Sequence, residues 1–155
     1  MPSVHTIIAS GAETPRERRY AVPSVKRLAS DSSKCIGCGA CMTVCSTLFF
    51  KVDDPARSCI SVIPSDSGSK ITVCDQTCRL CVAECPVQAL TVSSQGVVML
   101  DRKLCVGCLA CVAVCPIGAM RHFPGSANPF KCIACGACAR KCPTGAIGIA
   151  VEERS

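Results

Sequence analysis

Apolar residues along this chain occur in short runs separated by turn-forming residues. The pattern of Leu90–Leu100, two short apolar runs around a turn at Ser93–Gly96, predicts a β-hairpin. Cys59–Val62 predicts part of a strand after the turn at Pro55, and Ile147–Val151 predicts a strand that closes the chain. No apolar run reaches the roughly 18 residues that a membrane span needs, so we expect no membrane span.

The first 34 residues contain no cysteine and are rich in arginine and lysine. Val4–Ala9 predicts a short strand, and Thr14 and Glu17 form a capping box that starts a short helix ending near Ala21. Two interpretations of residues 1–34 stay open: a solvated tail, or an N-terminal docking arm that binds another subunit.

Cysteine spacing is the strongest chemical pattern in the chain. The segment Leu104–Met120 reads C-x2-C-x2-C-x3-C-P, the bacterial ferredoxin pattern for a [4Fe–4S] cluster. Three thiolates at two-residue intervals can hold three corners of one cube, and in two-cluster ferredoxins the fourth cysteine ligates the other cluster. Small and apolar residues between the cysteines let the backbone approach the cluster and keep water from the sulfurs.

This pattern occurs four times, and the copies account for all but one of the 17 cysteines. The first copy has Ser46 in place of the proline, and the second has three residues in its first gap. Four ligands per cube predict four [4Fe–4S] clusters as the cofactors. The predicted ligands are Cys35, Cys38, Cys41, Cys45, Cys74, Cys78, Cys81, Cys85, Cys105, Cys108, Cys111, Cys115, Cys132, Cys135, Cys138 and Cys142.

Two details of the cysteine pattern have alternative interpretations. The spacing of the second motif also matches the three-cysteine loop of radical S-adenosylmethionine enzymes. We reject that alternative because Cys85 and Pro86 complete a ferredoxin motif and the chain is too short for the large α/β barrel. Cys59 belongs to no motif, and we expect a buried apolar residue rather than a ligand or redox group.

Zinc and disulfides explain the cysteines less well. Zinc sites use two-cysteine knuckles separated by a longer loop, whereas each motif here holds four cysteines in one short segment. Disulfides are typical of oxidising compartments. Met1–Gly11 has neither the basic region nor the apolar run of a secretory signal, so we expect a cytoplasmic protein.

The distances between motifs favour a nested pairing. Pro86–Leu104, between the second and third motifs, is about as long as a two-cluster ferredoxin requires, whereas Ser46–Val73 is longer. The second and third motifs then form an inserted module, and the first and fourth form an outer module whose strands after Cys59 and Thr144 share a sheet. Sequential pairing, first with second and third with fourth, is the alternative.

The predicted fold is therefore α+β, with two ferredoxin-like two-cluster modules made of small antiparallel sheets, short helices and cluster-filled cores. The outer module covers residues 35–70 and 121–155, and the inserted module covers residues 71–120. Within each pair, the fourth cysteine of one motif ligates the cluster held by the first three cysteines of the other, and this predicts four ligand sets. These sets are Cys35, Cys38, Cys41 with Cys142; Cys132, Cys135, Cys138 with Cys45; Cys74, Cys78, Cys81 with Cys115; and Cys105, Cys108, Cys111 with Cys85.

The four motifs, with the segment DDPARSCISV between the first two, resemble the four-cluster ferredoxin-like electron-transfer subunits of multisubunit redox enzymes. The resemblance runs from Cys35 to Val151 and is greatest to the small subunits of tungsten-dependent aldehyde oxidoreductases. The resemblance implies nested pairing of the motifs. It also implies that the clusters relay electrons between a large catalytic subunit and a flavin subunit or soluble ferredoxin, and it favours a tungsten- or molybdenum-pterin enzyme as the catalytic subunit. Alternatives are a free-standing polyferredoxin, a relay subunit of a carbon monoxide dehydrogenase or hydrogenase, and self-stacking of copies into a longer wire.

The sequence contains no pattern for a substrate site beside these clusters. A phosphate-binding loop is absent, and His5 and His122 are too few and too far apart to suggest a catalytic triad. We therefore expect a non-catalytic electron-transfer subunit. The net charge of +6 is balanced by about −2 on each oxidised cluster, so it does not indicate a nucleic-acid partner.

Overall fold

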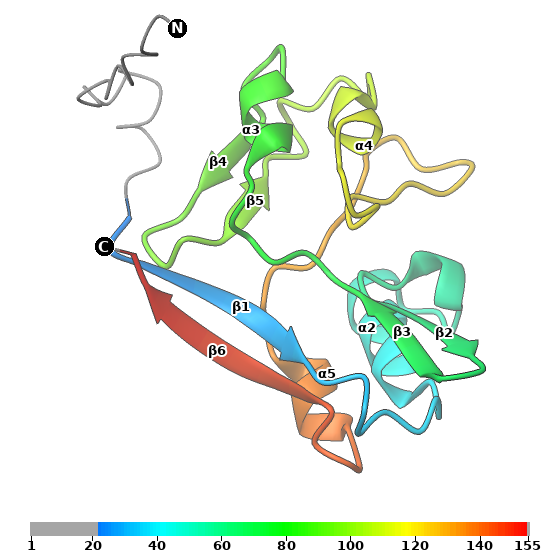
Figure 1. Cartoon of the computed structure of the whole chain (residues 1–155). Helices are drawn as coiled ribbons and strands as arrows, with labels where there is room; N and C mark the ends of the chain where they lie inside the picture. The colour runs from blue at the N-terminus through cyan, green and yellow to red at the C-terminus, as the bar shows by residue number, and fades with distance from the viewer. Residues whose placement is uncertain (1–21, 155) are drawn as a thin grey trace, which may run out of the picture.

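The computed structural model describes residues 22–154, so the predicted strand at Val4–Ala9 and the helix starting at Thr14 lie outside the described residues. Its helices and strands are short (Figure 1). In chain order they are β1 (Ser24–Ser30), α2 (Ala40–Phe50), the 3-10 helix η1 (Pro55–Arg57), β2 (Ser61–Ser65), β3 (Gly68–Thr72), α3 (Leu80–Glu84), β4 (Leu90–Val92), β5 (Val98–Leu100), α4 (Ala110–Ala113), α5 (Ala137–Lys141) and β6 (Ile147–Glu153).

The described strands form three antiparallel two-stranded sheets, in which β1 pairs with β6, β2 with β3 and β4 with β5. The β4–β5 hairpin confirms the prediction for Leu90–Leu100, and β6 confirms the closing strand. Small sheets with a few short helices fit an α+β, ferredoxin-like fold. None of the helices in the described part of the chain is long and apolar enough to cross a membrane.

Two predictions about the sheets are wrong. The strands after Cys59 and Thr144 do not share a sheet, because β2 pairs with β3 and β6 pairs with β1. Pro64–Lys70 is not a loop, since it forms the end of β2 and the start of β3, with Gly68 at a φ of 128° after the turn. Pairing β2 with the segment that directly follows it closes a much shorter loop than pairing it across the chain.

Strand β1 corrects the boundary of the predicted N-terminal arm. Ser24–Ser30 pairs with Ile147–Glu153 along its whole length, and its side chains Val25 and Leu28 are buried. This part of residues 1–34 therefore belongs to the folded body rather than to a free arm.

The β1 strand also contacts the turn of the β4–β5 hairpin. The Lys26 N–H donates a hydrogen bond of 2.8 Å to the Gln95 carbonyl. Gly96 has a φ of 75°, and a Cβ atom there would lie only 2.5 Å from the Ser24 carbonyl oxygen. The close approach of these two segments therefore requires glycine at this position.

The helices begin and end at motif residues. Each of the four α-helices within residues 22–154 is preceded by a residue with a left-handed backbone, namely Gly39, Arg79, Leu109 and Gly136. Cys85 and Cys142, which precede prolines, are extended and end α3 and α5 after five residues each. In the first motif Ser46 replaces proline, and α2 continues for 11 residues.

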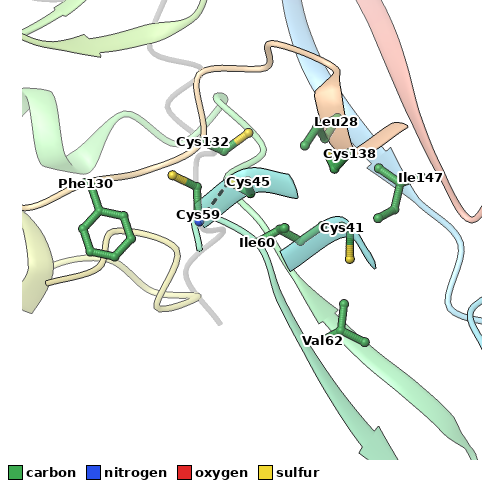
Figure 2. Close-up of a cluster of buried hydrophobic side chains, with 10 residues drawn as sticks. All are labelled: Leu28, Cys41, Cys45, Cys59, Ile60, Val62, Phe130, Cys132, Cys138 and Ile147. Atoms are coloured by element: carbon green, nitrogen blue, oxygen red, sulfur yellow. Dashed lines mark hydrogen bonds between the residues drawn. The ribbon is translucent and has the colours of Figure 1, made fainter. Parts of the chain in front are cut away.

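Buried side chains form two groups, which follow the packing of the helices. Helix α2 packs against α5, and α3 packs against α4 (Figure 1). The first group lies around α2, β2 and the fourth motif (Figure 2) and contains Leu28, Cys41, Cys45, Cys59, Ile60, Val62, Phe130, Cys132, Cys138 and Ile147. The second contains Val82, Leu90, Val98, Cys111 and Met120.

The continuation of α2 positions an aromatic cluster. Phe50, the last residue of α2, packs edge-on against Phe123 and Phe130, with ring centroids 5.3 Å and 5.1 Å away. Ser46 is fully buried, and its hydroxyl donates to the Thr43 carbonyl and accepts from the Asp54 N–H. A serine at this position therefore allows α2 to continue, and its hydroxyl connects the helix to the following segment.

We predict that Ser46→Pro, which restores the ferredoxin motif, destabilises the protein. Proline inside α2 removes a helical hydrogen bond and clashes with the preceding turn, which costs about 3 kcal/mol. Anaerobic urea denaturation of the cluster-loaded protein measures this loss. The control Ser46→Ala keeps the helix and should cost only about 1 kcal/mol for its lost hydrogen bonds; equal midpoints for the two variants would contradict the account.

Candidate iron–sulfur sites

The four cysteine loops share one backbone conformation. In each loop the second residue after the first cysteine has a positive φ, and so does the residue directly after the second cysteine. Such alternation of backbone conformation turns successive N–H groups toward a concave, anion-binding surface. The repeated pairs are Gly37 with Gly39, Gln76 with Arg79, Gly107 with Leu109, and Ala134 with Gly136.

The fourth cysteine of each motif accepts hydrogen bonds at its sulfur. The N–H of Ala89 lies 3.3 Å from the Cys85 Sγ, and the N–H of Ala119 lies 3.2 Å from the Cys115 Sγ, so both donors are four residues after the cysteine. Donors at this position stabilise the thiolate form that iron requires.

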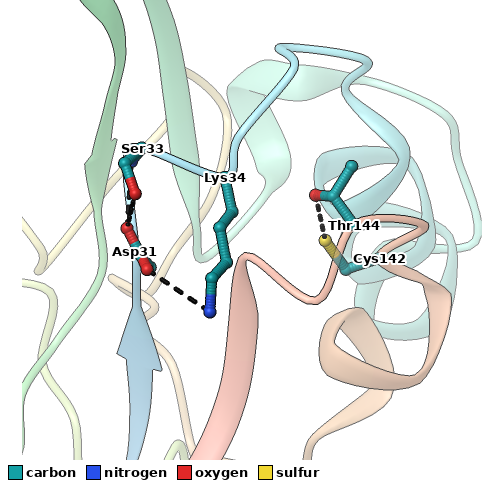
Figure 3. Close-up of polar contacts among 5 residues, drawn as sticks. All are labelled: Asp31, Ser33, Lys34, Cys142 and Thr144. Carbon is teal, nitrogen blue, oxygen red and sulfur yellow. Dashed lines mark hydrogen bonds and ion pairs between the residues drawn. The ribbon is translucent and has the colours of Figure 1, made fainter.

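Cys142 has a different donor. Its Sγ lies 3.6 Å from the Thr144 hydroxyl (Figure 3). Burial alone would raise the pKa of Cys142, but hydrogen bonds from the Thr144 side chain and backbone outweigh this effect and lower it. Deprotonation of Cys142 is therefore easier than that of an ordinary thiol.

Cys45 receives its hydrogen bond from a distant segment. The Cys59 N–H donates to the Cys45 Sγ at 3.3 Å, and both residues are buried (Figure 2). A hydrogen bond from the Cys59 thiol lowers the pKa of Cys45 to about 6 despite its burial, and the same contact raises the pKa of Cys59. The prediction of a buried Cys59 is confirmed, but no residue pattern predicts its contact with Cys45; Ser46 is what marks the first motif as unusual.

Three cavities of similar size, with empty volumes of about 380, 300 and 310 Å³, are each lined by four motif cysteines drawn from two motifs, and Cys59 also lines the second. In each case three cysteines begin one motif and one ends another. The first cavity has Cys74, Cys78, Cys81 and Cys115; the second has Cys132, Cys135, Cys138 and Cys45; the third has Cys35, Cys38, Cys41 and Cys142.

The remaining motif cysteines lie in and around the second buried group. Cys111 is buried within it, and Cys85 packs against it. Cys105 is half-buried and Cys108 is exposed, as are the second cysteines of the other three motifs. The structure thus brings Cys111 and Cys85 into one region.

The chemistry of these cavities fits iron–sulfur clusters. Burial raises the pKa of Cys81 to about 11, of Cys132 to about 11 and of Cys138 to about 12. Such thiols stay protonated at neutral pH unless a metal displaces the proton. Soft sulfur donors within a mostly apolar lining are the environment in which [4Fe–4S] clusters are held.

The cysteines are not arranged around a single metal ion. Among residues 22–154, no three histidine, cysteine or acidic side chains converge closely enough to bind one ion, so the four motif cysteines at each cavity would have to hold a larger group, such as a cluster. His122 donates a hydrogen bond of 2.9 Å from its Nε2 to the Ser126 carbonyl oxygen and so helps to order its own loop.

Comparison with protein families supports the same chemistry. Residues 97–143 and 73–119 match models of a 4Fe-4S dicluster domain, and residues 29–48 match a 4Fe-4S binding domain. These segments are similar to [4Fe–4S]-binding domains. The two dicluster matches overlap across the third motif, so the family models support the clusters without fixing their number.

Curated relatives share this iron–sulfur segment. The β subunit of NADH-dependent phenylglyoxylate dehydrogenase from Aromatoleum evansii is 37% identical over 57% of this chain and 21% of its own length. The thiosulfate reductase electron transfer subunit PhsB of Salmonella typhi is 33% identical over 56% of this chain and 50% of its own. The chain thus spans half or less of each of these two relatives.

A solved structure shares the fold. The active site complex BamBC of benzoyl coenzyme A reductase, bound to benzoyl-CoA, includes a chain that matches with a TM-score of 0.50. The match covers 85% of this chain and 83% of that one at 22% identity. At this identity the likeness concerns the iron–sulfur fold alone.

We predict that Cys59→Ser leaves the iron content unchanged, because the backbone N–H that contacts Cys45 remains and the motifs supply the ligands. Iron and acid-labile sulfide analysis of anaerobically prepared protein measures this. The matched variant Cys45→Ala removes a ligand and should lose about four irons per chain. Loss of a cluster from Cys59→Ser would show that Cys59 is itself a ligand.

Proposed function

We propose that this chain is a non-catalytic electron-transfer subunit of an oxidoreductase complex, which carries single electrons through four [4Fe–4S] clusters. The observation that carries the proposal is the set of three cavities, each lined by three cysteines of one motif and the last cysteine of another. In two-cluster ferredoxins the fourth cysteine of one motif ligates the cluster of the other, which is the arrangement at these cavities. One relative is also named as an electron transfer subunit.

Under this proposal the motifs pair in a nested order. The packing of α2 against α5 and of α3 against α4 supports an outer module of the first and fourth motifs and an inserted module of the second and third. Cys105, Cys108 and Cys111 with Cys85 form the remaining ligand set by the same exchange.

The chain's own residues hold the clusters and exclude water from them. Bound [4Fe–4S] clusters each take up and release one electron. The fourth cysteines receive hydrogen bonds from Ala89, Ala119, Cys59 and Thr144, which stabilise negative charge on sulfur. Apolar side chains such as Leu28, Ile60 and Val62 line the cavities of the outer module and exclude water from them.

The two modules form a linear relay with distinct ends. Gln76, inside the second motif, donates a hydrogen bond of 2.8 Å to the carbonyl of Cys132 in the fourth, so these two motifs meet at the centre. At the ends, Ile36 and Val106 follow the first cysteines of the first and third motifs, and both are 67% exposed. Exposed apolar residues beside a ligand suit the docking of redox partners, which supports docking at the two ends under this proposal.

A larger redox subunit is the inferred partner at one end. The resemblance favours a tungsten- or molybdenum-pterin enzyme, with a flavin subunit or ferredoxin at the other end. We predict that purification of the native complex yields a large subunit containing tungsten or molybdenum. Nickel in that subunit would contradict this partner class, and a stable monomer that carries electrons alone would contradict the subunit role.

Double substitutions test the nested ligand sets. Cys78→Ala and Cys115→Ala should each remove one cluster, and together they should still remove only one, because both lie at the same cavity. The matched pair Cys78→Ala with Cys45→Ala should remove two. Sequential pairing predicts the reverse for both pairs, so iron analysis of these proteins decides between the two schemes.

A further inference from the structure

A buried lysine lies where the second and fourth motifs meet. Lys131 is only 5% exposed, and its Nζ donates to the Gln76 Oε1 at 2.8 Å, the Val98 carbonyl at 2.9 Å and the Cys132 carbonyl at 2.7 Å. Three acceptors around one nitrogen require three N–H groups, which only the charged ammonium form provides.

No carboxylate among the described residues forms an ion pair with this buried charge. All three acceptors are neutral oxygens, and the ion pairs found among residues 22–154 do not include Lys131. Burying an ammonium group without a countercharge is costly, because neutral hydrogen bonds only partly replace its hydration. A neighbouring anionic group would offset this cost.

Two cluster sites lie on either side of the ammonium group. Lys131 itself lines the cavity that contains Cys74, Cys81 and Cys115. The next residue, Cys132, lines the cavity of the fourth motif. Gln76 connects the two sites, since its side chain contacts Lys131 and the Cys132 carbonyl while its backbone has the left-handed conformation of the second motif.

The charge of Lys131 acts on the thiols of both cavities. Burial raises the pKa of Cys74 and Cys81 in one cavity and of Cys132 in the other, and in each case the lysine charge opposes that rise. A fixed cation that favours thiolate there also favours any additional negative charge placed in either cavity.

We propose that the Lys131 ammonium is the shared counter-charge of the two central clusters and raises their reduction potentials above those of the two end clusters. The inference rests on the proposed function, because it requires all four clusters. An added electron is then held preferentially at the centre of the relay, between the two modules, and not at the exposed ends.

Lys131→Met tests this by removing the charge from a side chain of similar length. In an anaerobic redox titration followed by electron paramagnetic resonance, two of the four midpoint potentials should fall and the other two should stay. Lys34→Met is the matched control, because Lys34 directly precedes Cys35 as Lys131 precedes Cys132. The Lys34 side chain is 60% exposed and pairs with Asp31 at 3.5 Å (Figure 3), so solvent screens its charge and its loss should leave all four potentials close to wild type.

Iron analysis separates the possible failures. If wild-type protein holds fewer than four clusters, the proposed function is wrong; if Lys131→Met holds four clusters with unchanged potentials, the inference about Lys131 is wrong. If Lys131→Met loses iron, Lys131→Gln, which keeps two N–H donors without the charge, is measured in the same titration. Loss of about half the iron in both neutral variants, with full retention in Lys131→Arg, would support the inference, whereas loss of all the iron would contradict it.

Discussion

The burial of cysteine thiols around small cavities is the constraint on which the rest of this structure depends. Aromatic residues are few, and much of the first buried group consists of cysteines. Burial alone keeps most of these thiols protonated, so metal binding must supply the free energy that converts them to thiolates. Folding and cluster binding are therefore coupled, and the short sheets and helices serve mainly to hold four cysteine loops in place.

The left-handed residues of the loops are a second consequence of that constraint. Gln76, Arg79, Leu109 and Ala134 adopt a backbone conformation that is costly for residues other than glycine. The same positions recur in every motif, which indicates that the loop geometry, rather than the local residue type, fixes the conformation. Cluster sites commonly store strain of this kind at the backbone that faces the cofactor.

Local sequence patterns were sufficient to predict the iron–sulfur chemistry, from the cysteine spacing, and the hairpin at Leu90–Leu100, from its apolar runs and turn, because both depend on residues close together in the chain. It was not sufficient for β1, whose Lys26 and Arg27 hide the strand pattern and whose partner β6 lies at the other end of the described chain. The contact between Cys59 and Cys45, and the Lys131 junction, likewise join distant segments through backbone groups that no residue pattern marks.

The central claim is that one chain carries four one-electron centres in a row. Anaerobic reductive titration of the purified protein, calibrated by its iron and sulfide content, tests it most directly. The account predicts about sixteen irons, about sixteen sulfides and an uptake of about four electrons per chain. Half those values, or a colourless protein that takes up no electrons, would contradict it.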